Sequence, residues 1–366
     1  MKYVLCLVVL CAACSAKNTR EPPRPAEETP EQTHLWYGLS PEGFTEIPFP
    51  SASGEFVPWT VARRVCDSAL AGGEAYFLVN KLGLIAFGAG GPVLFREDAL
   101  FSTSTVDSLT APGGSILFHR FRDDFFSGGS PEQGPFDGAI LLRFDSESGR
   151  FLPLFLKDDA GLREDDEVTA VSFTGEGWYC QIKRRDGERV QVDYRLYALG
   201  EGQPAGVASM RSVSQDRFWG TLREESFPRA APEELAGLLP PVPEGSSLYL
   251  ECRFAGLPVP RRFSRNPEAP PGVNGHAAGT EDALAVLLED GTVYFRGALP
   301  GFPPYLGGEA AVFKLPSLPQ GFVYGHCVLA GGKLYAAWEE KKFYQTGRSG
   351  FVQVNLDALL YGGAEN

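Results

Sequence analysis

From about residue 60 onward, short apolar runs alternate with turns rich in Gly, Pro and Asp. Two segments align closely, LAGGEAYFLVN at residues 70–80 and LAGGKLYAAWE at residues 329–339. Each carries a tyrosine three residues after its second glycine, at Tyr76 and Tyr335. A glycine pair between two apolar runs is typical of a β-hairpin, because tight hairpin turns need positive φ angles. The pattern therefore predicts a strand on each side of both glycine pairs.

Four looser copies of this pattern occur elsewhere in the chain. They are APGGSILFHRF from Ala111, TGEGWYCQIKR from Thr174, EGSSLYLECRF from Glu244 and GTEDALAVLLE from Gly279. Several copies are followed by a third apolar run and a polar turn, as in AILLRFDSESGRFLPLF. This recurrence resembles a β-propeller, so we predict an all-β fold of six or seven four-stranded blades. No WD, kelch or NHL signature is present, so the resemblance concerns architecture alone.

A pair of β-sandwiches is the alternative architecture. It would need a linker near the middle of the chain, and the best candidate is the Pro-rich stretch at residues 257–272, which divides the chain unevenly. Amphipathic helices are scarce, and we expect short ones only in APEELAGLLP, at residues 231–240, and around residues 356–360.

The two ends of the body suggest how a ring of blades would close. The last copy supplies three strands before the chain ends, so a fourth strand is missing there. GFTEIPFP, from Gly43 to Pro50, has the short, Pro-flanked character of an edge strand. We predict that this N-terminal strand completes the last blade, closes the ring and covers an exposed sheet edge.

Composition and charge narrow the class of protein. The 366 residues include 43 Gly and 29 Pro, yet 43% are hydrophobic, which favours a packed core over a low-complexity chain. Lys and Arg number 33 against 46 Asp and Glu, giving a net charge of −13. A field of that sign repels phosphate backbones, so nucleic acid is excluded as a partner.

The N-terminus reads MKYVLCLVVLCAACSAKN, with Lys2 followed by an apolar run from Tyr3 to Ala13. That run is too short to cross a bilayer as a helix and is typical of an export signal. Its end, Leu10-Cys11-Ala12-Ala13-Cys14, resembles the lipobox of bacterial lipoproteins, departing from it at Cys11, where Leu is commonest. The resemblance implies removal of residues 1–13 and attachment of lipid, palmitate included, to Cys14. An ordinary signal peptide cleaved near Ala13 or Ala16 is the alternative.

The segment after Cys14 contains REPPRPAEETPEQ, which has no apolar periodicity. Such a segment cannot bury enough surface to fold, so residues 14–35 are predicted to be a flexible tether and residues 36–366 the β-propeller domain. Together these features place the protein in the bacterial cell envelope. We expect it to be anchored by lipid, on the periplasmic or surface face of the outer membrane.

Four cysteines remain in the body, each within or beside an apolar run: Cys66, Cys180, Cys252 and Cys327. We expect buried free thiols, with a disulfide such as Cys66–Cys327 as the alternative. No CxxC occurs, and the four histidines, His34, His119, His276 and His326, show no metal-ligand spacing with the cysteines. The sequence therefore predicts neither a metal ion nor a cofactor.

Catalytic motifs are equally scarce. No phosphate-binding loop, G-x-S-x-G elbow, HExxH or EF-hand occurs, so no catalytic residue is assigned. The acidic run KDDAGLREDDE is interpreted as a solvated loop. Its alternative is a calcium site formed by Asp158, Asp159, Asp165 and Asp166. The carboxylate pairs Glu339–Glu340 and Glu281–Asp282 are the candidates for glycosidase chemistry.

An aromatic-rich insertion is the remaining signal. Residues 122–138 carry Phe125, Phe126 and Phe136 among Gly, Ser and Pro, which indicates either a partner-binding tip or rings that cover a blade. The leading hypothesis is a non-catalytic, lipid-anchored binding or scaffold protein whose propeller loops contact envelope or outer-membrane proteins. The alternatives are an envelope carbohydrate-active enzyme, a glycosidase or lyase, and a small-ligand or sugar-binding module.

Overall fold

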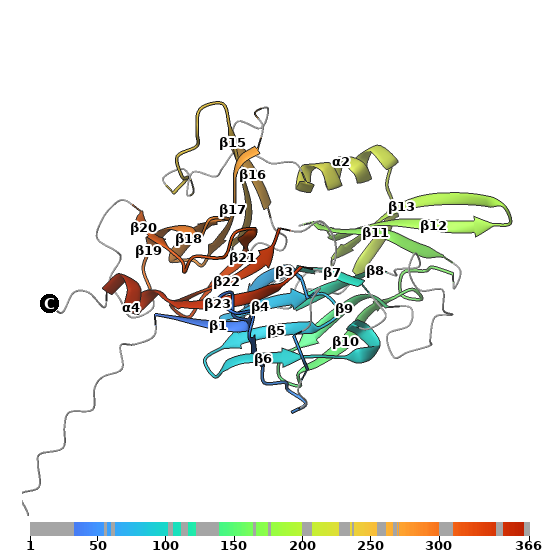
Figure 1. The fold of residues 1–366 in the computed structure, drawn as a ribbon. Coiled ribbons are helices and arrows are strands. Elements are labelled where there is room, and N and C mark those ends of the chain that lie inside the picture. The colour runs from blue at the N-terminus through green and yellow to red at the C-terminus, as the bar shows by residue number, and fades with distance from the viewer. Residues whose placement is uncertain are drawn as a thin grey trace, which may run out of the picture. The chain divides into compact units, whose positions relative to one another are not determined.

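The computed structural model describes residues 33–54, 57–59, 63–101, 105–110, 116–121, 139–163, 166–174, 177–199, 207–226, 235, 238–254, 261–265, 269, 271–299, 310–341 and 347–361. Residues Thr33–Asn366 form one compact unit. The described residues build five β-sheets, so the predicted all-β fold class is confirmed (Figure 1). None of the five sheets closes on itself.

Three of the sheets are antiparallel meanders of four strands. The first contains β3 (Val65–Ala71), β4 (Glu74–Val79), β5 (Gly83–Gly88) and β6 (Gly91–Phe95). The second contains β7 (Thr105–Thr110), β8 (Ile116–Phe121), β9 (Ala139–Asp145) and β10 (Arg150–Leu156). The third contains β11 (Glu167–Thr174), β12 (Gly177–Asp186), β13 (Arg189–Leu199) and β14 (Val207–Ser212). Neighbours in sequence are neighbours in each of these sheets, including β8 and β9, which are separated by residues 122–138.

The fourth sheet has six strands and a different topology, in the order β16-β15-β17-β18-β19-β20. Its members are β15 (Ser247–Phe254), β16 (Arg261–Arg265), β17 (Pro271–Gly279), β18 (Ala283–Leu288), β19 (Thr292–Gly297) and β20 (Ala311–Lys314). Strands β15 and β17 run parallel, with β16 returning on the far side of β15. A parallel pair needs a crossover rather than a hairpin, which sets this sheet apart from the meanders.

The fifth sheet joins both ends of the chain, in the order β2-β1-β23-β22-β21. Its members are β1 (His34–Leu39), β2 (Glu46–Ile47), β21 (Phe322–Ala330), β22 (Lys333–Glu340) and β23 (Ser349–Asn355). Figure 1 shows β1, in blue, beside β23, in red. An N-terminal strand therefore does complete the last sheet, as the sequence predicts.

The prediction is wrong, however, about which N-terminal segment pairs with β23. The strand that pairs with β23 is β1, whereas the predicted segment 43–50 contributes only β2, which pairs with β1. The physical reason is that β1 carries the apolar side chains Leu35, Trp36 and Tyr37, of which Trp36 and Tyr37 pack against the large core. Strand β1 also begins at His34, two positions before the predicted start of the domain at residue 36.

The two glycine pairs form the predicted hairpin turns. Gly72 and Gly73 have φ angles of 57° and 81° between β3 and β4, and Gly331 and Gly332 have 55° and 75° between β21 and β22. Two successive residues at positive φ define the type I′ turn, whose twist matches that of the flanking strands. Strand pairs also form at the copies beginning at Ala111, Thr174 and Gly279.

The copy at Glu244 does not form the predicted hairpin. A turn from Pro243 to Ser246 precedes β15, and β15 pairs with β16 and β17, both of which follow it in the chain. The described residues form five open sheets, so six or seven blades are not shown, and the alternative pair of β-sandwiches is compatible with them.

Three short helices accompany the sheets in the described part: α1 (Asp98–Phe101), α2 (Gln215–Ser226) and α4 (Leu356–Tyr361). Helix α4 matches the prediction around residues 356–360, and α2 is missed by it. Phe218 of α2 is fully buried against Tyr179 and Leu196, which anchors the helix on the third sheet. No helix among the described residues is both long enough and apolar enough to traverse a membrane.

The hydrophobic core is divided among several clusters that connect the sheets. The largest unites side chains of the fourth, fifth and first sheets, including Phe295, Phe351 and Phe77. A second cluster connects the first sheet to the second, and a third connects the second to the third. Successive sheets are thus held together by shared apolar contacts, which contribute most of the stabilisation of such a fold.

Candidate functional site

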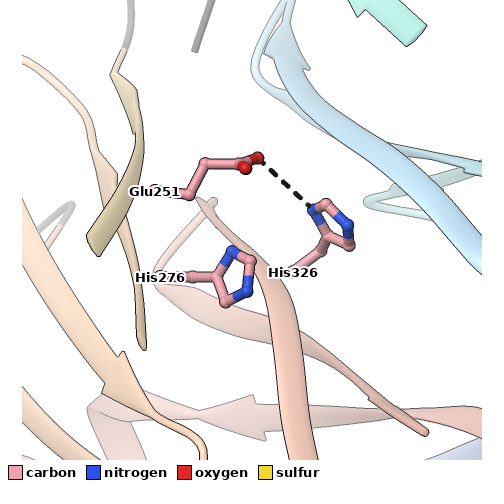
Figure 2. Close-up of side chains that lie close together, drawn as sticks. All are labelled: Glu251, His276 and His326. Atoms are coloured by element: carbon pink, nitrogen blue, oxygen red, sulfur yellow. Dashed lines mark ion pairs between the residues drawn. The ribbon is translucent and has the colours of Figure 1, made fainter. Parts of the chain in front are cut away.

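Three chemically active side chains meet where the fourth and fifth sheets adjoin. They are Glu251 on β15, His276 on β17 and His326 on β21 (Figure 2). One ligand atom of each lies within 4.8 Å of the others, and no second group of three or more His, Cys, Asp or Glu of this kind occurs among the residues that the structure describes. This cluster is the candidate functional site.

The parallel pairing of β15 and β17 brings Glu251 and His276 together. The two residues are direct register partners in the ladder, as are the following residues, Cys252 and Ala277. Register partners project to the same face of a sheet, and consecutive residues project to opposite faces. Glu251 and His276 therefore share one face, and Cys252 occupies the other, where it is buried in an apolar cluster.

His326 reaches the site from a distortion in β21. The ladder between β21 and β22 loses its register between Tyr324 and Cys327, so His326 lies in a β-bulge. A bulge bends its strand and re-aims the side chains there, and such distortions often accompany functional sites. Strand β21 also contacts β17, which carries His276.

The geometry of the cluster is tight. His326 Nδ1 lies 3.9 Å from Glu251 Oε1, the contact drawn as the dashed line in Figure 2, which is an ion pair when the imidazole is protonated. The two imidazole rings are 4.9 Å apart between centroids, with their planes inclined at 47°. The side chains of His326 and Glu251 are 19% and 20% exposed, so the site is partly shielded but open to water.

The neighbouring cysteines are not part of this cluster. Burial raises the pKa of the Cys327 thiol to about 12, with a further contribution from the Glu251 carboxylate. The pKa of Cys252 is raised by burial first, then by Cys327 and by Glu251. The Cys327 thiol donates a weak hydrogen bond to the His276 carbonyl oxygen at 3.8 Å. Both thiols therefore stay protonated at neutral pH, which leaves the imidazoles and the carboxylate as the reactive groups.

The cluster was not predicted from the sequence. Its members lie on three separate strands, at positions 251, 276 and 326, and no short spacing pattern joins the two histidines to the glutamate. The one available signal is that Glu251 and His326 each precede a buried cysteine within a strand-like run, YLECRF and YGHCVLA. The parallel register that makes Glu251 and His276 neighbours leaves no local trace in the sequence.

The body cysteines follow the prediction. Cys180, Cys252 and Cys327 are buried free thiols and Cys66 is a half-buried one, so the alternative Cys66–Cys327 disulfide is not formed. The residues predicted for lipidation and for partner binding, Cys14, Phe125, Phe126 and Phe136, lie outside the described residues.

The acidic residues considered as an alternative calcium site have other surroundings in the structure. Asp166 forms a two-bond ion pair with Arg184, and Asp165 lies outside the described residues. Asp158 and Asp159 are exposed in the turn after β10, where Asp159 accepts a hydrogen bond from the Leu156 amide. The described members of the alternative calcium set therefore do not form a joint site.

The carboxylate pairs considered for glycosidase chemistry are also accounted for. Glu339 pairs with Arg64 at 3.2 Å. Glu340 accepts two hydrogen bonds of 3.1 Å from the Arg348 guanidinium and one of 3.3 Å from the Arg348 amide. Burial raises the pKa of Glu339, and Arg64 opposes this shift. Glu281 and Asp282 are exposed in the turn before β18. None of these four belongs to a cluster with a histidine in the described part of the chain.

Comparison with known protein families assigns the chain to one of them. A family model described as "Family of unknown function (DUF8086)" matches residues 25–358. The chain belongs to the DUF8086 family. The match runs through all five sheets, so the family's defining region includes the cluster of Glu251, His276 and His326.

One relative of this DUF8086 chain covers nearly its full length. It is an "Uncharacterized lipoprotein" of Treponema pallidum (strain Nichols), 26% identical, and the match covers 98% of each chain.

Solved structures are similar only loosely. They include the polysaccharide lyase Uly1, with 12% identity and a TM-score of 0.22, covering 85% of this chain and 57% of the lyase. PorZ of the Porphyromonas gingivalis type-IX secretion system has 12% identity and a TM-score of 0.23, covering 79% of this chain and 38% of PorZ. Kluyveromyces lactis Hsv2 has 10% identity and a TM-score of 0.28, covering 79% of this chain and 98% of Hsv2. The chain thus spans about half the length of the first two. At these TM-scores the likenesses support no conclusion about function.

Proposed function

We propose that this DUF8086 protein is a lipoprotein of the bacterial envelope, anchored through Cys14, whose β-sheet body is a non-catalytic binding or scaffold module. Two observations support the anchor. The Treponema pallidum relative, which matches over 98% of both chains, is named a lipoprotein, and Cys14 follows two small residues at the end of a short apolar run.

The physical argument for the anchor concerns how a body with a net charge of −13 is held at a membrane. Anionic lipid headgroups repel such a body, so electrostatic attraction cannot supply the attachment. A single acyl chain gives only marginal binding, whereas two or more chains hold a protein stably. Residues 15–33 separate Cys14 from β1. As a flexible chain, these roughly 20 residues reach about 25 Å, which would keep the body close to the membrane surface without inserting it.

For the body, we propose a propeller-type arrangement in which each of the five sheets is one blade. Shared apolar clusters connect the fourth, fifth, first, second and third sheets in that order. The strand contacts support the same order, because β21 contacts both β17 and β3, and β3 contacts β7. In a propeller the innermost strands of successive blades adjoin, and β21, β3 and β7 are each an edge strand of their sheet, whereas β17 is an interior strand of the fourth sheet. The loops that connect the strands of a propeller lie on its two faces.

The proposed binding element is the insertion at residues 122–138. Phe125, Phe126 and Phe136 give it three large apolar side chains among small and polar residues, the composition of a contact loop. Envelope or outer-membrane proteins are the proposed partners, because the lipid would hold the loop within their reach.

The anchor is tested by acyl-labelling and membrane fractionation of cells that produce Cys14→Ala. The expected result is loss of the acyl label and release of the protein from the membrane fraction. Cys11→Ala is the matched control, since Cys11 follows Leu10 rather than a small residue, and it is expected to retain both label and membrane partition. A Cys14→Ala protein that stays labelled and membrane-bound contradicts the proposal.

The binding role is tested by chemical crosslinking in intact cells. Replacing Phe125, Phe126 and Phe136 together by Ser is expected to abolish crosslinks that the native protein makes with envelope proteins. Trp219→Ser is the control, because Trp219 is also an exposed aromatic residue but lies on α2. If both variants lose the crosslinks equally, or if neither variant loses them, the result contradicts the assignment of the insertion as the binding element.

A further inference from the structure

We propose that Glu251, His276 and His326 bind a divalent transition-metal ion of the zinc class, with at least one coordination position left for water. The proposal goes beyond the envelope role above and depends on neither the lipid anchor nor the insertion loop. It rests on the juxtaposition of two imidazoles and one carboxylate from three strands, each offering one ligand atom within 4.8 Å of the others.

The chemical types of the three ligands indicate which metal ion they would bind. Imidazole nitrogen and carboxylate oxygen are the ligands of zinc sites that have three protein ligands, where a water molecule takes the fourth position. Calcium and magnesium prefer sites built entirely from oxygen, so two histidines argue against them. The cysteines that would favour a closed structural zinc site face away into apolar clusters.

The distances are compatible with a modest contraction around an ion. Zinc lies about 2.0–2.2 Å from nitrogen and oxygen ligands, so two ligands of a tetrahedral site are about 3.4 Å apart. Glu251 Oε1 and His326 Nδ1 are separated by 3.9 Å, and the widest separation in the cluster is within 4.8 Å. Small side-chain rotations of Glu251 and His326 would bring all three ligands to bonding distance without moving a strand.

The backbone holds the ligands in place. Glu251 and His276 are fixed as register partners in the parallel pair of β15 and β17, and both strands continue in register for several residues beyond them. His326 is directed toward them from the bulge in β21. Ligands on a sheet are positioned more firmly than ligands on loops. Folding therefore already orders these side chains, and little further conformational entropy is lost when an ion binds.

The partial exposure of the site gives the ion access to water. With 19% of the His326 side chain and 20% of the Glu251 side chain exposed, the cluster is partly accessible to solvent, although His326 Nδ1 itself is buried. An ion held there by three protein ligands would keep an exchangeable position, which suits it to coordinate an oxygen-bearing ligand of the envelope as well as water.

The experiment uses the protein as its native host produces it, purified in detergent without a histidine tag, stripped with a chelator and then titrated with Zn²⁺. Calorimetry and elemental analysis are expected to give one tightly bound zinc per chain. Co²⁺ is the second probe, and its visible absorption is expected to report nitrogen and oxygen ligands without thiolate. A native protein that retains no zinc after dialysis overturns the proposal.

Three variants test the ligands themselves: Glu251→Gln, His276→Ala and His326→Ala. Each is expected to weaken zinc binding by at least about tenfold, and the triple variant to abolish the stoichiometric site. His34→Ala and Glu42→Gln are the matched controls, since both residues lie on the fifth sheet or beside it and belong to no cluster with the three ligands. Unchanged zinc binding in the triple variant would show that the metal lies elsewhere and would overturn the assignment.

A measurement on the native protein covers the case in which a variant fails to fold. Diethyl pyrocarbonate modifies accessible histidines, and the products are located by mass spectrometry of peptides. Bound zinc is expected to protect His276 and His326 and to leave the modification of His34 unchanged. Equal modification of all three with and without zinc counts against the site regardless of how the variants behave.

Discussion

The Asp166 carboxylate accepts two hydrogen bonds from the Arg184 guanidinium, of 2.7 Å and 2.6 Å, and its side chain is completely buried. It also accepts a 3.0 Å bond from the Arg163 amide. The pair fastens the turn before β11 to β12. The hydrogen bonds from Arg184 are the largest cause that holds the pKa of Asp166 below its ordinary value, and they outweigh the opposing effect of desolvation.

We predict that Asp166→Ala lowers the free energy of unfolding by about 1.5–3 kcal/mol, the range for a hydrogen-bonded charge removed from a buried site. Urea denaturation at neutral pH measures this difference. Asp158→Asn is the control, because Asp158 is exposed, and it is expected to change stability by less than about 0.5 kcal/mol. Equal stability of Asp166→Ala and the native protein would contradict the structural role of the pair.

The same pair predicts a dependence on pH. Since the pKa of Asp166 is lower in the folded state than in the unfolded state, its contribution is fully present above the unfolded value of about 3.9. It is lost as the pH falls through the lower folded value. The difference in unfolding free energy between the native protein and Asp166→Asn is therefore expected to be constant from pH 7 to about pH 5 and to shrink in stronger acid. A difference that grows on acidification would contradict this sign.

Removal of β1 tests the contribution of the N-terminal strand to the last sheet. Trp36 and Tyr37 of β1 lie opposite Val352 and Phe351 of β23, and Leu39 is buried. A chain that begins at Ser40 is expected to lose about 3 kcal/mol or more of stability, because burying one large apolar side chain contributes about 1.5–3 kcal/mol. It also exposes the edge of β23 and should aggregate more readily. A chain that begins at Thr33 is the control, and equal melting temperatures for the two chains would show that β1 adds nothing.

Two glycines with positive φ should respond differently to alanine. Gly83 has a φ of 149°, and a Cβ there would collide with the backbone oxygen of Phe95, whereas Gly72 has a φ of 57° and open space around its Cβ position. Gly72→Ala is expected to cost about 1–2 kcal/mol from backbone strain alone. Gly83→Ala should cost more, because the collision adds to strain of about 1–3 kcal/mol. Thermal unfolding of the two variants side by side decides this order.

The cysteines predict a pattern of thiol labelling. Burial raises the pKa of Cys180 and Cys327 to about 12, so about one thiol in ten thousand is ionised at pH 8. In a Cys14→Ser protein, Cys66 is expected to react with a thiol reagent in the native state. The three buried cysteines are expected to react more than about a hundredfold more slowly, until denaturant is added. Rapid native labelling of Cys252 or Cys327 would show that the strands around the candidate site open readily.

Much of the strand pattern can be predicted from local sequence. The glycine pairs at Gly72–Gly73 and Gly331–Gly332 form the predicted I′ turns, because a glycine pair meets the φ requirement of that turn at little cost. The all-β class follows from the same recurrence. At Glu244 the same reasoning fails, because a Gly-bearing turn before an apolar run does not reveal whether a strand precedes it.

Tertiary structure alone decides which strands become neighbours, and with that the candidate site. Glu251, His276 and His326 meet because β15 pairs in parallel with β17 and because β21 carries a bulge at His326. The parallel pairing and the bulge are choices of strand register, and register is determined by which side chains the packed sheets bury on each face. Local sequence specifies where the hairpins turn and that the body is built of strands. The packing of sheets decided which strand completes the last sheet, how many sheets there are, and which polar side chains face one another, because pairing energies are non-local whereas turn and strand preferences are local.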